Sequence, residues 1–115
     1  MVEKTRVIGK VPERAAWLYV LNSQQAGRDY RLQAETTIGR DDATCEVILT
    51  DSQLSAEHAR IRREGNSYVL YDLASRNGTT LNGECVQRHI LSDNDVLQLG
   101  ATRLIFKVVP NMSQP

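Results

Sequence analysis

The 115-residue sequence has no excess of either charge, because fourteen Lys and Arg residues balance fourteen Asp and Glu residues. Proteins that bind nucleic acids or anionic membranes generally carry a surplus of cations that displaces counterions. We therefore expect neither kind of partner. The sequence also lacks the run of about 18 apolar residues that a membrane-spanning helix needs. Its first residues show no apolar segment typical of a secretory signal, so we expect a cytoplasmic protein.

Cysteine is scarce, and the two that occur, Cys45 and Cys85, are far apart and match no metal-ligand spacing. We expect two reduced thiols, as is usual in cytosolic proteins, although the sequence also allows a disulfide between them. Clustered carboxylates, metal ligands and a nucleotide-binding loop are missing as well. The sequence therefore predicts no enzymatic activity, no metal site and no cofactor.

The length and the composition, with 41% hydrophobic and 24% charged residues, are those of one folded domain with its own core. The first 14 residues are charged and show no strand pattern, and the last six are polar and contain two prolines. We expect flexible tails at residues 1–14 and 110–115, with the domain at residues 15–109 between them.

Apolar residues alternate with polar ones along most of that domain, which is the pattern of β-strands that bury one face. No segment shows a helical stripe of ten or more residues. Short strands separated by turns favour an all-β fold with two packed sheets, a β-sandwich. The segments with this alternation are residues 17–21, 29–34, 36–38, 45–49, 58–63, 67–73, 96–99 and 103–109.

The predicted loops contain residues that a generic sandwich does not need. They are Gly39-Arg40, then S-A-E-H at residues 55–58, S-R-N-G-T at residues 75–79, and Asn82-Gly83. Each signal is weak alone; Asn-Gly, for example, is an ordinary turn sequence because both residues tolerate positive φ. Together and in this order, they form a specific set.

This set of motifs resembles that of the forkhead-associated (FHA) domains, which are phosphothreonine-peptide binding modules. The resemblance runs from Trp17 to Val109 and includes L-S-D-N-D-V-L-Q-L-G at residues 91–100, which matches the family's closing hairpin. It implies a sandwich of about eleven short, mostly antiparallel strands (FHA/SMAD-like). It also implies a phosphothreonine-containing partner protein and a Ser/Thr protein kinase that phosphorylates it.

The resemblance assigns phosphate binding to Arg40 and Ser55 and peptide-backbone binding to Asn77. The chemistry is suitable, because a planar guanidinium can bond two phosphate oxygens at once. Ser55 offers a hydroxyl donor and, we expect, its own backbone N–H, and Gly39 leaves space beside the ligand. A side-chain amide both donates and accepts, so Asn77 can pair with an extended peptide. The alternatives are a surface salt bridge for Arg40 and a plain turn cap for Ser55.

The remaining motif residues are expected to act around this site. Arg76 contacts either the phosphate or the residues that follow it, or is simply solvated. His58 is expected to support the Ser55 loop, with a direct phosphate contact as the alternative. The sequence supplies no orienting acid or oxyanion hole for catalysis with Ser55. Loop-shaping roles are expected for Gly39, Gly78, Thr79, Asn82 and Gly83.

One residue departs from the family pattern: many members carry Arg or Lys directly after the serine, where this sequence has Ala56. One cation directed at phosphate is therefore missing, and affinity is lower unless Arg76 compensates. The departure favours a rival hypothesis, in which the domain is a phosphate-independent assembly module of a larger complex.

The N-terminal tail suggests a ligand within the chain itself. Thr5 lies in E-K-T-R-V-I, with the aliphatic Ile8 three residues after it, and many FHA domains select peptides by that position. Some small bacterial FHA proteins bind a phosphothreonine of their own tail. The hypothesis is that phosphorylated Thr5 engages the site in cis or in a neighbouring copy; an unmodified polar tail is the alternative.

Overall fold

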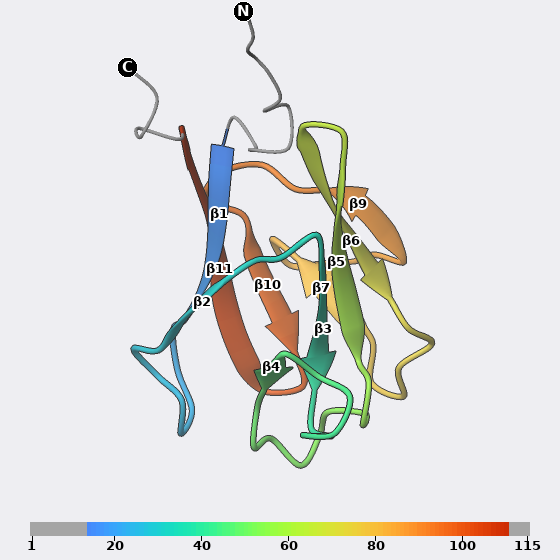
Figure 1. Ribbon diagram of the computed structural model, residues 1–115. Coiled ribbons are helices and arrows are strands. Elements are labelled where there is room, and N and C mark those ends of the chain that lie inside the picture. The colour runs from blue at the N-terminus through green and yellow to red at the C-terminus, as the bar shows by residue number, and fades with distance from the viewer. Residues whose placement is uncertain (1–13, 111–115) are drawn as a thin grey trace, which may run out of the picture.

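The computed structural model describes residues 14–110, which form two β-sheets packed face to face (Figure 1). One sheet has six strands in the order β2-β1-β11-β10-β7-β8, and the other has five in the order β4-β3-β5-β6-β9. The strands are β1 (Arg14–Val20), β2 (Asp29–Arg31), β3 (Glu35–Gly39), β4 (Val47–Ile48), β5 (Ala59–Glu64), β6 (Ser67–Asp72), β7 (Thr79–Leu81), β8 (Glu84–Cys85), β9 (Arg88–Ile90), β10 (Val96–Leu99) and β11 (Thr102–Pro110).

All strand pairs are antiparallel except β3 and β4, which are parallel. The longest pairing joins β1 to β11 and places Leu18 opposite Phe106. This arrangement confirms the predicted sandwich of about eleven short, mostly antiparallel strands.

The core lies between the sheets and is built from the inward-facing residues of the alternating pattern. In β11, Leu104 and Phe106 are buried, whereas the intervening Ile105 is only partly buried. The ring of Tyr68 on β6 packs against Phe106, with 5.7 Å between the ring centroids. This contact joins the two sheets, so the core holds both of them while their loops remain at the ends of the sandwich.

The strands differ from the predicted segments mainly where they are short. The predicted strand at residues 45–49 is reduced to the two residues of β4, and the one at 29–34 to the three residues of β2. The sequence pattern did not locate β7, β8 or β9, which have three, two and three residues. Arg14 and Pro110 pair with each other at the ends of β1 and β11, so both strands extend one residue beyond the expected domain.

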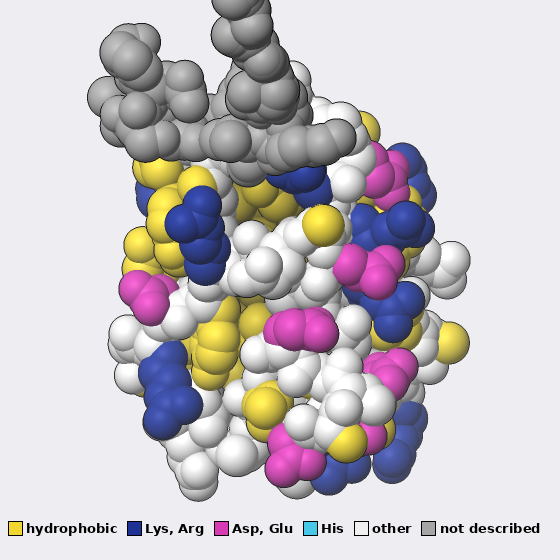
Figure 2. Space-filling model, viewed as in Figure 1, with side chains coloured by type: hydrophobic (Ala, Val, Ile, Leu, Met, Phe, Trp, Pro, Cys, Tyr) yellow, Lys and Arg dark blue, Asp and Glu magenta, His cyan; other side chains and the backbone are white. Residues whose placement is uncertain are grey.

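Acidic and basic side chains are interspersed over the face shown in Figure 2, in keeping with the balanced net charge. Cys45 is buried and Cys85 exposed, and both are free thiols rather than a disulfide pair. No stretch of residues 14–110 forms a helix with the length and apolar character to cross a membrane. Thr5 lies outside the described residues.

Candidate functional site

Three loops meet at one end of the five-stranded sheet. They are residues 40–46 between β3 and β4, residues 49–58 between β4 and β5, and residues 73–78 between β6 and β7. They meet because the strands alternate in direction: Ala59 at the start of β5 lies opposite Ile38 near the end of β3 and opposite Asp72 at the end of β6. This end is at the bottom of Figure 1 and contains the predicted Arg40, Ser55 and Asn77.

Arg40 is fixed against the β4–β5 loop by its backbone and by one nitrogen of its side chain. Its N–H donates to the carbonyls of Ala56 at 3.0 Å and Ser55 at 3.4 Å, and its Nε donates to the carbonyl of Leu54 at 2.7 Å. No carboxylate of residues 14–110 lies within 4.0 Å of the guanidinium. The exposed side chain therefore presents its two Nη groups to solvent in a defined orientation.

Ser55 joins two of the loops through its hydroxyl. Its Oγ accepts a hydrogen bond from the backbone N–H of Arg76 at 3.1 Å, which leaves the hydroxyl proton to donate elsewhere. The backbone N–H of Ser55, which we expect from the sequence to be a second donor to the phosphate, is not available. The backbone N–H of Ser55 donates to Nδ1 of His58 at 3.1 Å, so it points into the protein and away from a ligand.

His58 is completely buried and links the same two loops from below. Because Nδ1 accepts from a backbone N–H, the ring donates from Nε2, and that nitrogen lies 2.8 Å from the carbonyl oxygen of Gly78. Both ring nitrogens are engaged by the backbone, and neither is bonded to the hydroxyl of Ser55. This geometry suits a supporting residue and not a general base.

Asn77 reaches across to the β4–β5 loop. Its Nδ2 donates to the carbonyl of Gln53 at 2.7 Å, which holds the amide group at the surface with one N–H and the oxygen remaining. Its neighbour Arg76 is exposed, and its guanidinium has no carboxylate within 4.0 Å among residues 14–110. A hollow of about 460 Å³ opens beside these two residues.

The β6–β7 loop is closed by Asp72, a residue that the sequence motifs did not single out. One carboxylate oxygen accepts from the hydroxyls of Ser75 at 2.5 Å and Thr79 at 2.7 Å, and the other accepts from the N–H of Ser75 at 3.1 Å. The Ser75 hydroxyl in turn accepts from the N–H of Gly78 at 2.9 Å. Burial acts to raise the pKa of Asp72, but the hydrogen bonds from Ser75 and Thr79 outweigh it and hold the pKa below its ordinary value.

Asp51 anchors the β4–β5 loop to the other sheet and was also missed by the motifs. Its Oδ2 accepts from the N–H of Ala101 and from the hydroxyl of Thr102, both at 2.8 Å, and its Oδ1 accepts from the N–H of Gln53 at 2.9 Å. Burial acts to raise the pKa of this carboxyl, and the bond from Gln53 and those from residues 101 and 102 lower it overall. The only sequence signal was a D-x-Q turn, which is too common to be informative.

Gly39 lies against the neighbouring β4–β5 loop. Its φ lies outside the left-handed region, and a Cβ at this position would overlap with the carbonyl oxygen of Ala56 and approach Sγ of Cys45 at 3.0 Å. That carbonyl accepts from Arg40 and Asp41 and from the Cys45 thiol, whose pKa is raised by burial. Gly39 thus makes room for the neighbouring loop.

Asn82 and Gly83 are not brought together with the other motif residues. They form the β7–β8 turn, at the opposite end of β7 from Thr79. The Asn82 side chain binds the start of β10, accepting from the N–H of Val96 at 2.9 Å and donating to Asp95 at 3.0 Å. Within residues 14–110, no group of three or more His, Cys, Asp or Glu side chains is placed to hold a metal ion.

Comparison with known proteins gives consistent matches. The FHA domain family model matches residues 36–100. An oxoglutarate dehydrogenase inhibitor from Corynebacterium jeikeium is 36% identical over 84% of this chain and 67% of its own length. The glycogen accumulation regulator GarA from Mycolicibacterium smegmatis is 33% identical over 87% of this chain and 63% of its own. The chain thus spans roughly two thirds of each relative.

A solved structure gives the same result in three dimensions. A chain from a structural and functional analysis of phosphothreonine-dependent FHA domain interactions superposes with a TM-score of 0.77 at 35% identity, covering 84% of this chain and 99% of that one. The family model spans more than half of the sequence, and its match includes Arg40, Ser55 and Asn77. The chain belongs to the FHA domain family.

Proposed function

We propose that this domain binds proteins that carry phosphothreonine and acts in Ser/Thr-kinase signalling in the cytoplasm by binding rather than by catalysis. The observation that carries the proposal is the convergence of three loops on residues 53–56. Arg40, Arg76 and Asn77 all bond to that segment, which itself contains Ser55. A cation, a hydroxyl and an amide are thereby held at one surface by elements far apart in the sequence.

The phosphate is assigned to Arg40 and Ser55. With Nε of Arg40 already bonded to the carbonyl of Leu54, the two Nη groups are pre-oriented and can bind two phosphate oxygens. The hydroxyl proton of Ser55 provides a further donor. Each charge-assisted bond contributes roughly 1.5–3 kcal/mol net, so three of them contribute about 5–9 kcal/mol. Micromolar affinity, about −8 kcal/mol, lies within that range.

The peptide main chain is assigned to Asn77. Its amide has one donor and its acceptor oxygen left after bonding Gln53, which matches the N–H and C=O of an extended peptide. Arg76 and Asn77 also line the hollow of about 460 Å³, which extends to Val86. We assign this hollow to the residues that follow the phosphothreonine.

The relatives support a regulatory binding role. Those reported above are named as an inhibitor of oxoglutarate dehydrogenase and as a regulator of glycogen accumulation, and the solved chain comes from work on phosphothreonine-dependent FHA interactions. We propose that this chain likewise acts on a partner protein and that its ligand is made by a Ser/Thr kinase.

A titration calorimetry experiment with three matched peptides tests the proposal. The phosphothreonine peptide should bind with micromolar affinity and the unphosphorylated one at least 100-fold more weakly. The phosphoserine peptide should bind about 5- to 100-fold more weakly than the phosphothreonine one, since it lacks a methyl group that a small apolar hollow can hold. Equal binding of the phosphorylated and unphosphorylated peptides contradicts the proposal.

We further propose that phosphorylated Thr5 is a ligand for this same site, in cis or in a second copy. In cis, the tail competes with outside partners through its high effective concentration, and in trans it links copies into dimers or chains. A phospho-Thr5 peptide titrated against the chain lacking the tail should bind through Arg40. No binding at millimolar peptide overturns this idea.

The competing function is phosphate-independent assembly, which the exposed, uncharged Ala56 favours. A pull-down from cell extract before and after phosphatase treatment distinguishes the two functions. Loss of the captured proteins after treatment supports phosphothreonine binding, and unchanged capture supports an assembly module.

A further inference from the structure

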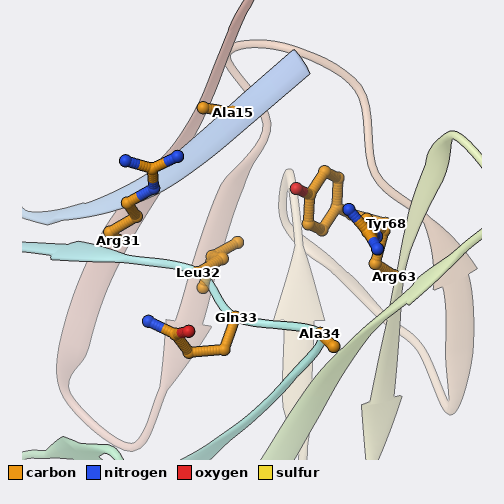
Figure 3. A pocket seen from close by; sticks show the side chains of 7 residues that line it. All are labelled: Ala15, Arg31, Leu32, Gln33, Ala34, Arg63 and Tyr68. Atoms are coloured by element: carbon orange, nitrogen blue, oxygen red, sulfur yellow. The ribbon is translucent and has the colours of Figure 1, made fainter. Parts of the chain in front are cut away.

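A second hollow, of about 250 Å³, lies at the opposite end of the sandwich. Strand β3 runs from Glu35, next to this hollow, to Gly39 at the phosphopeptide site, so its five residues separate the two by roughly 15 Å. The hollow lies between the start of β1, the β2–β3 connection and the β5–β6 hairpin. Its lining, drawn in Figure 3, consists of Ala15, Arg31, Leu32, Gln33, Ala34, Arg63 and Tyr68.

The hydroxyl of Tyr68 points into this hollow (Figure 3). The residue is only 5% exposed, and its ring is fixed against Phe106 in the core. The hydroxyl forms no hydrogen bond with any of residues 14–110, in contrast to the buried hydroxyl of Thr79, which bonds to Asp72. Among the described residues, the hydroxyl is thus left to donate to a group placed in the hollow.

Two arginines from different segments line the same hollow. Neither Arg31 nor Arg63 has a carboxylate within 4.0 Å among residues 14–110, and the lining contains no Asp or Glu. The adjacent Arg62, by contrast, pairs with Glu35 at 3.2 Å. Arg31 is held over the ring of Trp17, with its guanidinium carbon 5.5 Å from the ring centroid. The hollow thus has two cations that no acidic residue of the described part of the chain neutralises.

We propose that this hollow is a second ligand site, which binds a carboxylate on a short aliphatic stem. Guanidinium, phenol and the Gln33 amide all supply donors, and a planar guanidinium matches the two oxygens of a carboxylate. Ala15, Leu32 and Ala34 provide an apolar wall for methylene groups. The volume falls below the usual range of pockets for larger ligands, so a group of glutarate size fits best. The carboxylate comes either from a free dicarboxylate or from an acidic side chain of a partner protein.

Titration of the full chain with two probes tests the site and identifies the source. Glutarate represents a free dicarboxylate, and N-acetyl-glutamate amide represents a side chain of a protein. The readouts are amide NMR shifts of the lining residues and the fluorescence of Trp17, the single tryptophan, whose ring contacts Arg31. Sodium chloride at equal ionic strength is the control.

We expect saturable shifts with millimolar dissociation constants and no such response to sodium chloride. Binding of glutarate alone identifies the free acid as the ligand, binding of the amide alone identifies a protein side chain, and binding of both identifies the carboxylate group itself. Absence of saturable shifts with both probes overturns the proposal.

Three variants locate the binding. Tyr68→Phe keeps the ring contact in the core and should weaken the bound probe about tenfold, as should Arg63→Gln. The matched control Arg62→Gln should change the affinity less than twofold. Equal weakening by Arg62→Gln and Arg63→Gln, or no effect of Tyr68→Phe, overturns the proposal. Phosphopeptide affinity should stay within twofold in all three, which shows that they fold and separates this site from the first.

Discussion

The two ends of the sandwich use their buried polar groups differently. At the end proposed to bind the phosphopeptide, the hydroxyls of Ser75 and Thr79 bond to Asp72 across the β6–β7 loop. The two ring nitrogens of His58 bond to backbone groups of the β4–β5 and β6–β7 loops. At the opposite end, the buried hydroxyl of Tyr68 points into a hollow and bonds to none of residues 14–110.

This difference shows where the shape of the recognition surface comes from. The loops that carry the candidate site have no strand pairing of their own. Hydrogen bonds between the loops therefore set the positions of Arg40 and Asn77. The parts of the Arg40 and Asn77 side chains that these bonds do not use are exposed and can bind a ligand. At the other end the core itself fixes Tyr68, through the ring of Phe106, and no hydrogen bond of its hydroxyl to residues 14–110 contributes.

The largest effect is expected from His58→Ala, because His58 bonds to two of the loops that carry the candidate site. The substitution leaves the N–H of Ser55 and the carbonyl of Gly78 without their partner and opens a cavity, so we expect about 3–5 kcal/mol less unfolding free energy and loss of phosphopeptide binding. Denaturant unfolding and calorimetry measure these effects. His89→Ala, which removes the exposed second histidine, is the control and should be neutral.

A matched pair of hydroxyl deletions compares the two ends directly. Thr79→Val removes a bond to the Asp72 carboxylate and should cost about 1–2 kcal/mol of unfolding free energy. Tyr68→Phe removes a hydroxyl that has no such bond and should change the unfolding free energy by less than about 0.5 kcal/mol. Equal losses in both variants would mean that the two hydroxyls are equally structural.

A smaller effect is expected from acid, through Asp72. Its pKa is lowered in the folded state, so its stabilising contribution is complete above the ordinary pKa of about 3.9 and is lost as pH falls through the lower, folded-state pKa. Unfolding free energy measured from pH 6 to pH 2 should therefore fall less steeply in Asp72→Asn. The exposed Asp42→Asn should leave the pH dependence unchanged; identical curves for all three proteins contradict the assignment.

The smallest effect is expected from Ala56→Lys, which adds a cation beside the proposed phosphate site. The side chain is exposed and its carbonyl is bonded to the N–H of Arg40, so a lysine there adds a cation near the phosphate without disturbing the loop. We expect roughly a threefold to fivefold gain in phosphopeptide affinity, in the range of an exposed ion pair. Ala26→Lys adds the same charge in the β1–β2 loop and should have no effect beyond twofold.

The sequence predicted the fold best where strands are long enough to alternate. The predicted segments at residues 58–63, 67–73, 96–99 and 103–109 lie within two residues of β5, β6, β10 and β11. Strand β9 could not be predicted, because its three residues are all exposed and no apolar alternation marks them.

The site was predictable only as a set of motif residues. Arg40, Ser55 and Asn77 were predicted from the resemblance to a family. In the structure, Arg40 and Asn77 bond to residues 53 and 54, next to Ser55. Asp51 and Asp72 could not be found, because an aspartate at or after the end of a strand is common. Some of their partners are distant in the sequence and visible only in three dimensions: Thr102 is 51 positions from Asp51. The reason for Gly39 was equally hidden, since the carbonyl that approaches it belongs to another loop.

The phosphopeptide affinity of Arg40→Ala, measured beside that of Arg62→Ala, tests the central claim most directly. Arg40 is held at the converging loops by the carbonyl of Leu54, whereas Arg62 is an exposed arginine of the same sheet paired with Glu35. We predict that Arg40→Ala weakens phosphothreonine-peptide binding by roughly 30- to 1,000-fold, or about 2–4 kcal/mol, with unchanged stability, and that Arg62→Ala changes it less than twofold. Equal affinities of the two variants would contradict the account.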